Sequence, residues 1–531
     1  MVDQAMPSAE GAARDAVSLR AAAEKAGPYA YYALFLLVTA NFFNYVDRQI
    51  VSILAHGIQK DLGLTDAKLG FILGTAFAVL YGVVGVAMGR ISDALSRTKM
   101  MASGLALWSG MTALSGLATN FTGLAAARIG VGVGEATANP CSHSLLSDYF
   151  PARNRSAVLG TYLVGTHLGG AGAFILGGYL LQHWATMCQS LPGGACGVSG
   201  WRAAFFAVGI PGLLLSVLLF MLREPPRPSL DAGRRPMALI LKEMSAAVPP
   251  FTLYNLFDIG GWSALTRNLV FTVILVAGSV GMGLLTGDWA QWIAVAIGLY
   301  SVTTWAGVLK MRDRPMFALT FGCPTFVFTV VGAATIGCLT STVHVWSAPY
   351  MMRNLGTNPA ETGLLLGVVT AVTAATSAVV GGYLTDKWKQ HNRRAPAFVA
   401  LFALVAPAPA LLLMMRADGP TTFMVGYALF TLFSMPWSGG IGALVQDLAL
   451  PRMRGTASAA FSLIVIVLSS GLGPYWAGKI STLTGSLTNG LYSILVVVPI
   501  GAVFLLLAAS RLPRETPASR LARAQAAGEP A

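Results

Sequence analysis

Long apolar segments follow one another along most of the chain, and the loops between them are short and hold most of the Lys and Arg. A helix needs about 20 apolar residues to cross the hydrocarbon core of a bilayer. Because lipid offers the backbone no hydrogen-bond partners, spanning segments fold as helices or as closed barrels. We therefore expect an all-α membrane protein. The segments predict fourteen helical spans, near residues 31–55, 69–89, 100–119, 123–147, 157–183, 202–222, 268–286, 290–309, 316–348, 361–385, 396–415, 421–446, 456–478 and 488–510.

The low content of charged residues argues against a soluble globule of this size. The chain is 55% hydrophobic and 11% charged, whereas soluble domains hold about 25% charged residues. Its net charge of +13 would fit a nucleic-acid-binding protein only if the basic residues gathered on one folded surface. They lie instead in short loops between apolar segments, which is the pattern of a membrane protein.

The distribution of Lys and Arg predicts the topology. With the N-terminus inside, 27 of the 35 basic residues fall in inner segments, 6 fall in outer segments, and Arg48 and Arg128 lie within spans. Because basic residues favour the cytoplasmic side, both termini are expected in the cytoplasm. Residues 1–29 lack the pattern of a cleaved signal peptide. We expect a multi-pass protein of a cell membrane, with a bacterial inner membrane as the expected location.

The chain contains an internal repeat. Residues 61–93 align without gaps on 354–386, and Gly70, Gly74 and Asp93 then coincide with Gly363, Gly367 and Asp386. Two similar six-span bundles are therefore predicted, an organisation in which secondary transporters place the binding site between the halves. The expected division is a cytoplasmic tail at 1–29, a first bundle at 30–222, a cytoplasmic linker at 223–267, an extra hairpin at 268–309, a second bundle at 316–510 and a cytoplasmic tail at 511–531. The hairpin has no counterpart in the repeat, and we interpret it as a lipid-facing connector in preference to a direct role.

Four charged residues lie at bilayer depth: Asp47, Arg48, Arg128 and Glu135. An intramembrane charge is costly and is therefore a functional candidate by default. At roughly 1.5 Å per residue, Asp47 lies about 25 Å from the inner end of its span, a level that Arg128 can share. We predict that ionised Asp47 pairs with Arg128. Protonation would release Arg128 to Glu135 or to an anionic substrate, which would couple transport to protons. The alternatives are that these charges only fix helix packing, or that Arg128 extends to the outer surface.

Other residues give weaker signals. Asn41, Asn44, Tyr162 and His167 are candidates for lining a cavity. Cys188 and Cys196 share a loop on the predicted outer side, where a disulfide is plausible. No metal site, cofactor or catalytic residue is expected, because the chain holds no Walker loop, no HExxH, no nucleophile elbow and no Cys/His cluster.

Two groups of motifs resemble a known family. Gly89-Arg-Ile-Ser-Asp93-Ala-Leu-Ser-Arg97-Thr-Lys99, echoed at Gly382-Tyr-Leu-Thr-Asp386-Lys387, resembles the signature loop of the major facilitator superfamily. Asn44-Tyr-Val-Asp47-Arg48 and Arg128-Ile-Gly-Val-Gly-Val-Gly-Glu135 are similar to the Spinster branch. The resemblance implies a proton-linked carrier of lysolipid-like or sphingolipid-like amphiphiles. We interpret Gly89, Asp93, Arg97, Asp386 and Lys387 as latch residues that hold the inner gate in one state.

The leading hypothesis is therefore a proton-coupled secondary transporter of amphiphilic solutes that works as a monomer by alternating access. Its expected partners are a lipid or other amphiphilic small molecule, protons and membrane lipid, with no nucleic acid. A carrier of small organic anions and a multidrug efflux carrier are the close alternatives. A channel and a membrane enzyme are the hypotheses from other classes, and the chain offers no catalytic motif for an enzyme.

Overall fold

The computed structural model describes residues 27–151, 154–190, 197–225 and 252–530, and this part of the chain is helical with no strands. Eleven of its helical segments are long and apolar enough to cross a membrane. The predicted spans near 31–55, 100–119 and 123–147 are also helices, but they lie outside that set. The all-α architecture is confirmed, and the number fourteen stays a prediction.

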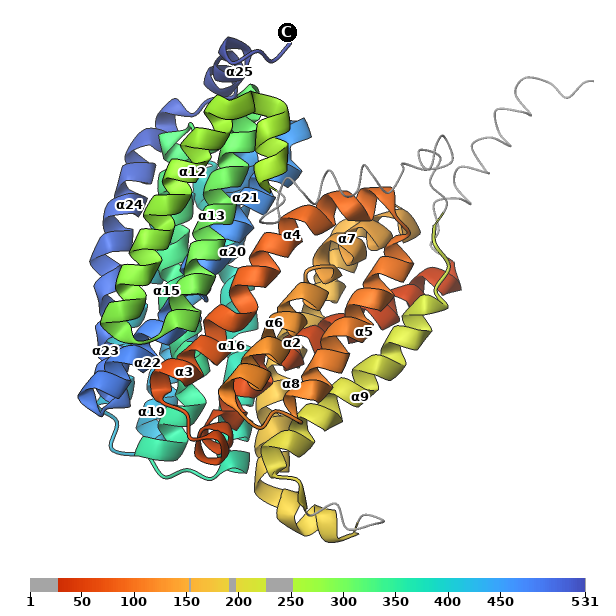
Figure 1. The fold of residues 1–531 in the computed structure, drawn as a ribbon, viewed down its shortest axis with the longest axis vertical. Helices are drawn as coiled ribbons and strands as arrows, with labels where there is room; N and C mark the ends of the chain where they lie inside the picture. The colour runs from red at the N-terminus through yellow and green to blue at the C-terminus, as the bar shows by residue number, and fades with distance from the viewer. Residues whose placement is uncertain (1–26, 152–153, 191–196, 226–251, 531) are drawn as a thin grey trace, which may run out of the picture.

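The first half of the chain forms one group of helices (Figure 1). They are α2 (Pro28–Leu62), α3 (Asp66–Gly70), η1 (Phe71–Thr75), α4 (Ala76–Ala94), α5 (Arg97–Ser115), α6 (Phe121–Glu135), α7 (Ala138–Tyr149), α8 (Arg155–Met187), η3 (Cys188–Ser190) and α9 (Gly200–Phe220). Following the predicted topology, we call the side of the molecule near Leu62 the outer side and the side near Pro28 the inner side.

The second half forms the other group. It holds α14 (Arg314–Leu319), α15 (Pro324–Asn354), α16 (Pro359–Lys389), α17 (Ala395–Val405), α18 (Pro407–Met415), α19 (Pro420–Ser434), α20 (Trp437–Asp447), η5 (Pro451–Met453), α21 (Arg454–Leu468), α22 (Gly473–Thr484), α23 (Leu487–Ser493), η6 (Ile494–Val496), α24 (Val497–Arg511), η7 (Leu512–Arg514) and α25 (Pro517–Ala526). One contact joins two equivalent positions of the repeat. The Ser52 hydroxyl donates to the carbonyl oxygen of Val345 at 2.6 Å, and these positions differ by the repeat offset of 293.

The extra hairpin consists of α12 (Thr252–Thr286) and α13 (Trp289–Arg312). α12 begins at Thr252, within the segment 223–267 that the sequence predicts as a cytoplasmic linker, and that division stays a prediction. Asp258 and Arg267 interrupt the apolar pattern in this stretch, which is why the sequence did not reveal the helix. Gly261 has φ of 59° and kinks α12, and the segment before it turns so that the Thr252 hydroxyl lies 3.0 Å from that of Tyr300 in α13.

The two hairpin helices differ in their surroundings. α12 is mostly exposed along its length, in agreement with a lipid-facing connector. α13 instead packs between the halves: the Gln291 side chain lies 2.6 Å from the Thr75 hydroxyl of η1 and donates to the Gly471 carbonyl oxygen at 2.9 Å. At the outer turn, Asp288 pairs with Lys479 of α22 at 2.7 Å. The interpretation of the hairpin as a lipid-facing connector therefore fits α12, but it does not account for the contacts that α13 makes with both halves.

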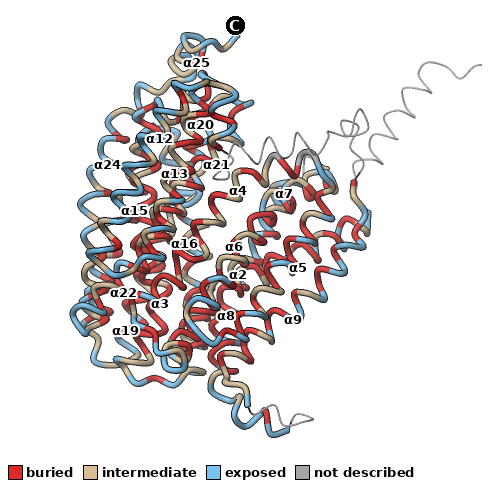
Figure 2. The backbone as a smooth tube through the Cα atoms, in the orientation of Figure 1, coloured by how far each residue is buried: buried red, intermediate tan, exposed pale blue. Residues whose placement is uncertain are grey.

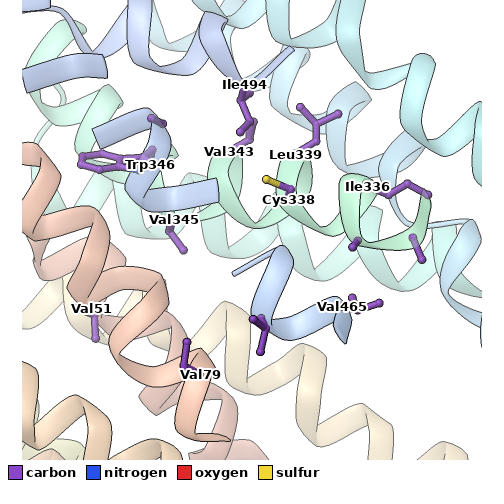
Figure 3. Packing of buried hydrophobic residues seen from close by; sticks show 14 of the residues in the cluster. Val51, Val79, Ile336, Cys338, Leu339, Val343, Val345, Trp346, Val465 and Ile494 are labelled. Carbon is purple, nitrogen blue, oxygen red and sulfur yellow. The ribbon is translucent and has the colours of Figure 1, made fainter. Parts of the chain in front are cut away.

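The apolar core crosses the interface between the halves, and buried positions gather where helices face one another (Figure 2). In one cluster, Trp346, Val343 and Leu339 of α15 lie among buried side chains that include Val51 and Val79 of the first half (Figure 3). The indole of Trp346 also donates to the Pro474 carbonyl oxygen at 3.0 Å.

Glycines allow α2 and α8 to pack closely. A Cβ atom added at Gly169 would lie 2.4 Å from the Phe42 carbonyl oxygen and 2.9 Å from the Tyr45 Cβ. The next residue, Gly170, has nothing within 4 Å of such an atom. Small residues at contacts of this kind are what let membrane helices approach.

We expect Gly169→Ala to destabilise the protein by about 1–3 kcal/mol, because the added methyl group has no space against the backbone of α2. Gly170→Ala is the matched control and should leave stability nearly unchanged. Thermal unfolding of both purified variants measures the difference. Equal melting temperatures for the two variants would contradict the packing described for α2 and α8.

Candidate functional site

The charged motif of α6 is held close to its neighbours by glycines. A Cβ atom added at Gly132 would lie 2.5 Å from the Phe77 carbonyl oxygen of α4, and one at Gly134 would lie 2.7 Å from the Trp108 amide nitrogen of α5. The alternation of Gly with Val between Arg128 and Glu135 thus brings α6 against two helices at once. As a result, Arg128 and Glu135 are 2% and 0% exposed, respectively.

Arg48 and the buried Glu135 form the ion pair of the site. The Arg48 Nε atom lies 2.6 Å from Glu135 Oε2. The guanidinium carbon of Arg48 also lies 5.1 Å from the ring centre of Tyr45, 4.9 Å from that of Phe77 and 4.5 Å from that of Tyr81. Three aromatic faces stabilise the cation by cation–π attraction. The Arg48 side chain keeps 19% of its surface exposed, so part of the guanidinium can meet a solute.

Asp47 lies on another face of α2 and is 1% exposed. Arg128 and Glu135 are near enough to act on it electrostatically, and the Thr112 hydroxyl lies nearby. Among the described residues, neither Asp47 carboxylate oxygen accepts a hydrogen bond of normal geometry, and the Arg128 Nε and Nη1 atoms have no partner either. The structure thus brings the four predicted residues together but does not form the predicted Asp47–Arg128 pair. Glu135 pairs with Arg48 instead.

The predicted cavity residues have different roles. Asn41 is 2% exposed, and its amide donates to the Tyr162 carbonyl oxygen at 2.8 Å and to the Thr166 hydroxyl at 3.0 Å, so it joins α2 to α8 instead of lining a cavity. Asn44 is buried beside Glu135. His167 is half-buried on α8.

A short polar chain leads from the ion pair to an exposed residue. Tyr81, whose ring lies beside Arg48, accepts a hydrogen bond from the Asn139 amide at 3.3 Å. The Tyr162 hydroxyl donates to Asn139 Oδ1 at 3.4 Å. Asn139 is exposed on α7, as is His143 one helical turn further. Tyr81 and Asn139 were absent from the predicted set, because single Tyr and Asn residues within apolar spans give no distinctive pattern.

The second half contributes a polar group that the sequence did not indicate. His344 of α15 lies 3.4 Å through Nδ1 from the Tyr427 hydroxyl, which lies 2.9 Å from that of Thr370. The His344 ring also contacts Phe174 of α8, with 6.2 Å between ring centres. The second half therefore presents a titratable side chain to the first half.

Among the predicted latch residues of the first half, Arg97 is the one whose side-chain contacts the structure describes. Arg97 is fully buried and pairs with Asp148 at 2.5 Å and with Glu224 at 2.7 Å. Burial raises the pKa of the Glu224 carboxyl, but hydrogen bonds from the Thr98 amide and Arg97 outweigh it and lower the pKa overall. These contacts join helix ends within the first half.

The second-half latch residues make no such contact. Asp386 and Lys387 are exposed, and neither has an ion pair with another described residue. Their neighbour Lys389 pairs with Asp447. No neighbour lies within 4 Å of a Cβ atom added at Gly89, and the side chain of Asp93 lies outside the described residues.

Cys188 is disulfide-bonded, but its predicted partner Cys196 lies outside the described residues, so the pairing itself stays a prediction. Within the described ranges, no group of three His, Cys, Asp or Glu residues is arranged to hold a metal ion.

The outer ends of the two halves are held together by Asp66 at the start of α3. Its carboxylate accepts hydrogen bonds from Arg353 at 2.7 Å and Ser481 at 2.6 Å, both in the second half, and from Gln59 at 2.8 Å. α8 and α16 also meet toward this side, where a Cβ atom added at Gly178 would lie 2.3 Å from the Pro359 carbonyl oxygen. We call the group Gln59, Asp66, Arg353 and Ser481 the outer closure.

A family model of the Major Facilitator Superfamily matches residues 37–348 and 330–530, which together span most of the chain. The chain belongs to the Major Facilitator Superfamily. It is therefore a membrane transporter of small molecules.

Individual relatives agree with the resemblance to Spinster proteins. The chain is 26% identical over 501 residues to an MFS-type efflux pump of Mycolicibacterium smegmatis, covering 93% of this chain and 96% of the pump. It is 24% identical over 475 residues to protein spinster homolog 1 of Xenopus tropicalis, covering 84% of this chain and 72% of that protein. A crystal structure of a bacterial homolog to the human lysosomal transporter Spinster, in an inward-facing and unoccupied conformation, shares the fold of this superfamily member. Its TM-score is 0.68 at 22% identity, over 93% of this chain and 100% of that one.

Proposed function

We propose that this protein is a proton-coupled secondary transporter of amphiphilic, lipid-like solutes that works by alternating access. The arrangement of Asp47, Arg48, Arg128 and Glu135 is the observation that carries this proposal. Asp47, Arg128 and Glu135 are buried beside the partly exposed Arg48, and one of the two acids has no ion-pair partner among the described residues. With both acids ionised the four charges cancel, and a proton bound to either acid leaves one net positive charge at bilayer depth.

A buried net charge is costly, so protonation should be coupled to a compensating anion or to a rearrangement. Arg48 is placed to receive the anion, since it is the partly exposed member of the cluster and lies in an aromatic box. The phosphate of a lysophospholipid would meet the guanidinium, and its acyl chain would lie along apolar walls. When the solute leaves and the site opens to the other side, the acid would release its proton.

The closed outer side fits one end state of this cycle. Asp66 joins the halves at their outer ends, while the polar chain from Arg48 leads through Tyr81 to exposed Asn139 on the inner half of the fourth predicted span. We take the arrangement as inward-facing, with both termini in the cytoplasm, in a cell membrane.

A carrier of small organic anions or a multidrug efflux carrier is the second candidate. The similarity to an efflux pump over nearly the whole chain favours it.

Solute transport into proteoliposomes distinguishes the candidates. Purified protein is reconstituted, and a lysophospholipid, a sphingoid base and a small organic anion are offered with and without a pH gradient. We expect the lysophospholipid to move in a gradient-dependent manner that a protonophore abolishes. Transport of the organic anion alone would overturn the amphiphile proposal, and transport that ignores the gradient would overturn proton coupling.

A further inference from the structure

A crevice between the two hairpin helices lies far from the buried charge cluster. It has a volume of about 240 Å³ and is lined by the early part of α12, by the part of α12 after the kink and by the end of α13. Leu256, Phe271 and Met311 supply apolar surface, and Arg267 and Lys310 supply two positive charges. The kink at Gly261 creates the crevice, because it turns the segment that holds Leu256 back toward α13.

The two basic residues lie at the level of a lipid headgroup. From the outer turn at Thr286 to Arg267, α12 runs about 28 Å at roughly 1.5 Å per residue. From Trp289 to Lys310, α13 runs about 31 Å by the same measure. The hydrocarbon core is about 30 Å thick. Both cations therefore reach the inner boundary of the hydrocarbon core. The helical segments between these cations and the outer turn lie within the hydrocarbon core.

The crevice faces the bilayer. Val270, Val273 and Ile274 follow Arg267 on α12 and are 60–66% exposed, which is expected of a surface covered by acyl chains. Arg267 and Lys310 are exposed too, and neither forms an ion pair with another described residue. Lys310 only lies over the Phe317 ring, at 5.7 Å. Two free cations above an apolar crevice are complementary to one anionic group that carries acyl chains.

We propose that this crevice binds an anionic phospholipid of the inner leaflet, with its phosphate between Arg267 and Lys310 and an acyl chain against Leu256, Phe271 and Met311. Basic pockets between membrane helices on the cytoplasmic side bind anionic headgroups in this way. The site is separate from the transport site, so the lipid is a bound partner of the hairpin and not the transported solute.

The test uses the full chain in a neutral detergent, titrated with 1-palmitoyl-2-oleoyl phosphatidylglycerol and, in parallel, with the matching phosphatidylcholine, with binding measured by native mass spectrometry. We expect preferential retention of phosphatidylglycerol. Arg267→Gln with Lys310→Gln should weaken that binding roughly 30-fold, since each cation near an anionic lipid contributes to the affinity. Arg393→Gln with Arg394→Gln removes two charges from another inner loop and serves as the matched control.

A second variant tests the cavity itself. A Cβ atom added at Gly307 has nothing within 4 Å, so Gly307→Leu should fill the crevice without disturbing the helices, and it retains both charges. We expect it to reduce phosphatidylglycerol binding, while Asp47→Asn leaves that binding intact even if transport fails. The proposal is overturned if both phospholipids bind equally, if the control pair weakens binding as much as the Arg267 and Lys310 pair, if Gly307→Leu binds as the native chain does, or if free glycerol phosphate competes as well as the lipid.

Discussion

Asp47→Asn is expected to abolish proton-driven accumulation of solute. Asparagine keeps the size of the side chain but cannot bind or release a proton, and the remaining acid, Glu135, is held in its ion pair with Arg48. A pH gradient of one unit is worth about 1.4 kcal/mol per proton, which supports a roughly tenfold solute gradient at one proton per solute. In the variant, the ratio of solute across the membrane should fall from roughly ten to about one.

The measurement is the steady-state solute ratio in proteoliposomes at a fixed gradient, together with its dependence on pH. Asp61→Asn is the matched control, because Asp61 also lies on α2 but accepts a hydrogen bond from the Trp201 indole at 2.7 Å, within the first half. Unchanged accumulation and unchanged pH dependence in Asp47→Asn would exclude Asp47 as the coupling residue. If Glu135→Gln alone removed both, the proton site would be assigned to Glu135.

Asp66→Ala is expected to open the outer side. Asp66 loses its hydrogen bonds to Arg353 and Ser481, which are the two that cross between the halves. Hydrogen bonds to a charged group contribute about 1.5–3 kcal/mol each. A loss of about 3 kcal/mol would shift the balance between outer-closed and outer-open states roughly a hundredfold. Arg353→Gln should shift this balance in the same direction but by a smaller amount, because Ser481 and Gln59 still bind the carboxylate.

Distances between spin labels measure this shift. Leu117 and Asp418 are exposed residues of loops on the outer side of the first and second half, respectively, and neither belongs to the outer closure. We expect a longer distance population in Asp66→Ala and Arg353→Gln. Asp61→Asn, on the same side but bonded within one half, should keep the native distribution. An unchanged distribution in both closure variants would show that the other contacts between the halves hold the outer side closed, such as the hydrogen bond from the Ala67 amide to the Thr482 hydroxyl and the packing of α8 against α16.

The architecture could be predicted from the sequence, because the architecture depends on properties that are averaged over many residues. Apolar length, the positions of Lys and Arg, and the repeat offset together predict helices and two halves. The contact between Ser52 and Val345 reproduces that offset. The four intramembrane charges were also found from the sequence, since a charge within an apolar span stands out on its own.

The partners of those charges could not be derived in the same way. Helical spacing places Arg128 and Glu135 on one face of α6, but it does not specify how that face is turned toward α2. The glycines against Phe77 and Trp108 decide this rotation, and it brings Glu135 to Arg48. The aromatic rings around Arg48 were missed because aromatic residues are common in any membrane span. Asn41 was misassigned because its amide satisfies backbone and hydroxyl groups of α8, an arrangement that only the packing reveals.

The docking of α13 makes the two borders between the halves unequal. On one border, Gln291 of α13 binds both the Thr75 hydroxyl of η1 and the Gly471 carbonyl oxygen just before α22, so α13 covers this junction. On the other border, α8 meets α16 directly, and apolar side chains such as Leu168 and Val379 remain exposed along these helices. A fold with near-twofold internal symmetry thus has one flank that an additional helix covers and one flank without such a helix. For a solute that diffuses laterally in the lipid, α13 would block approach from its own flank, so entry is expected from the flank of α8 and α16.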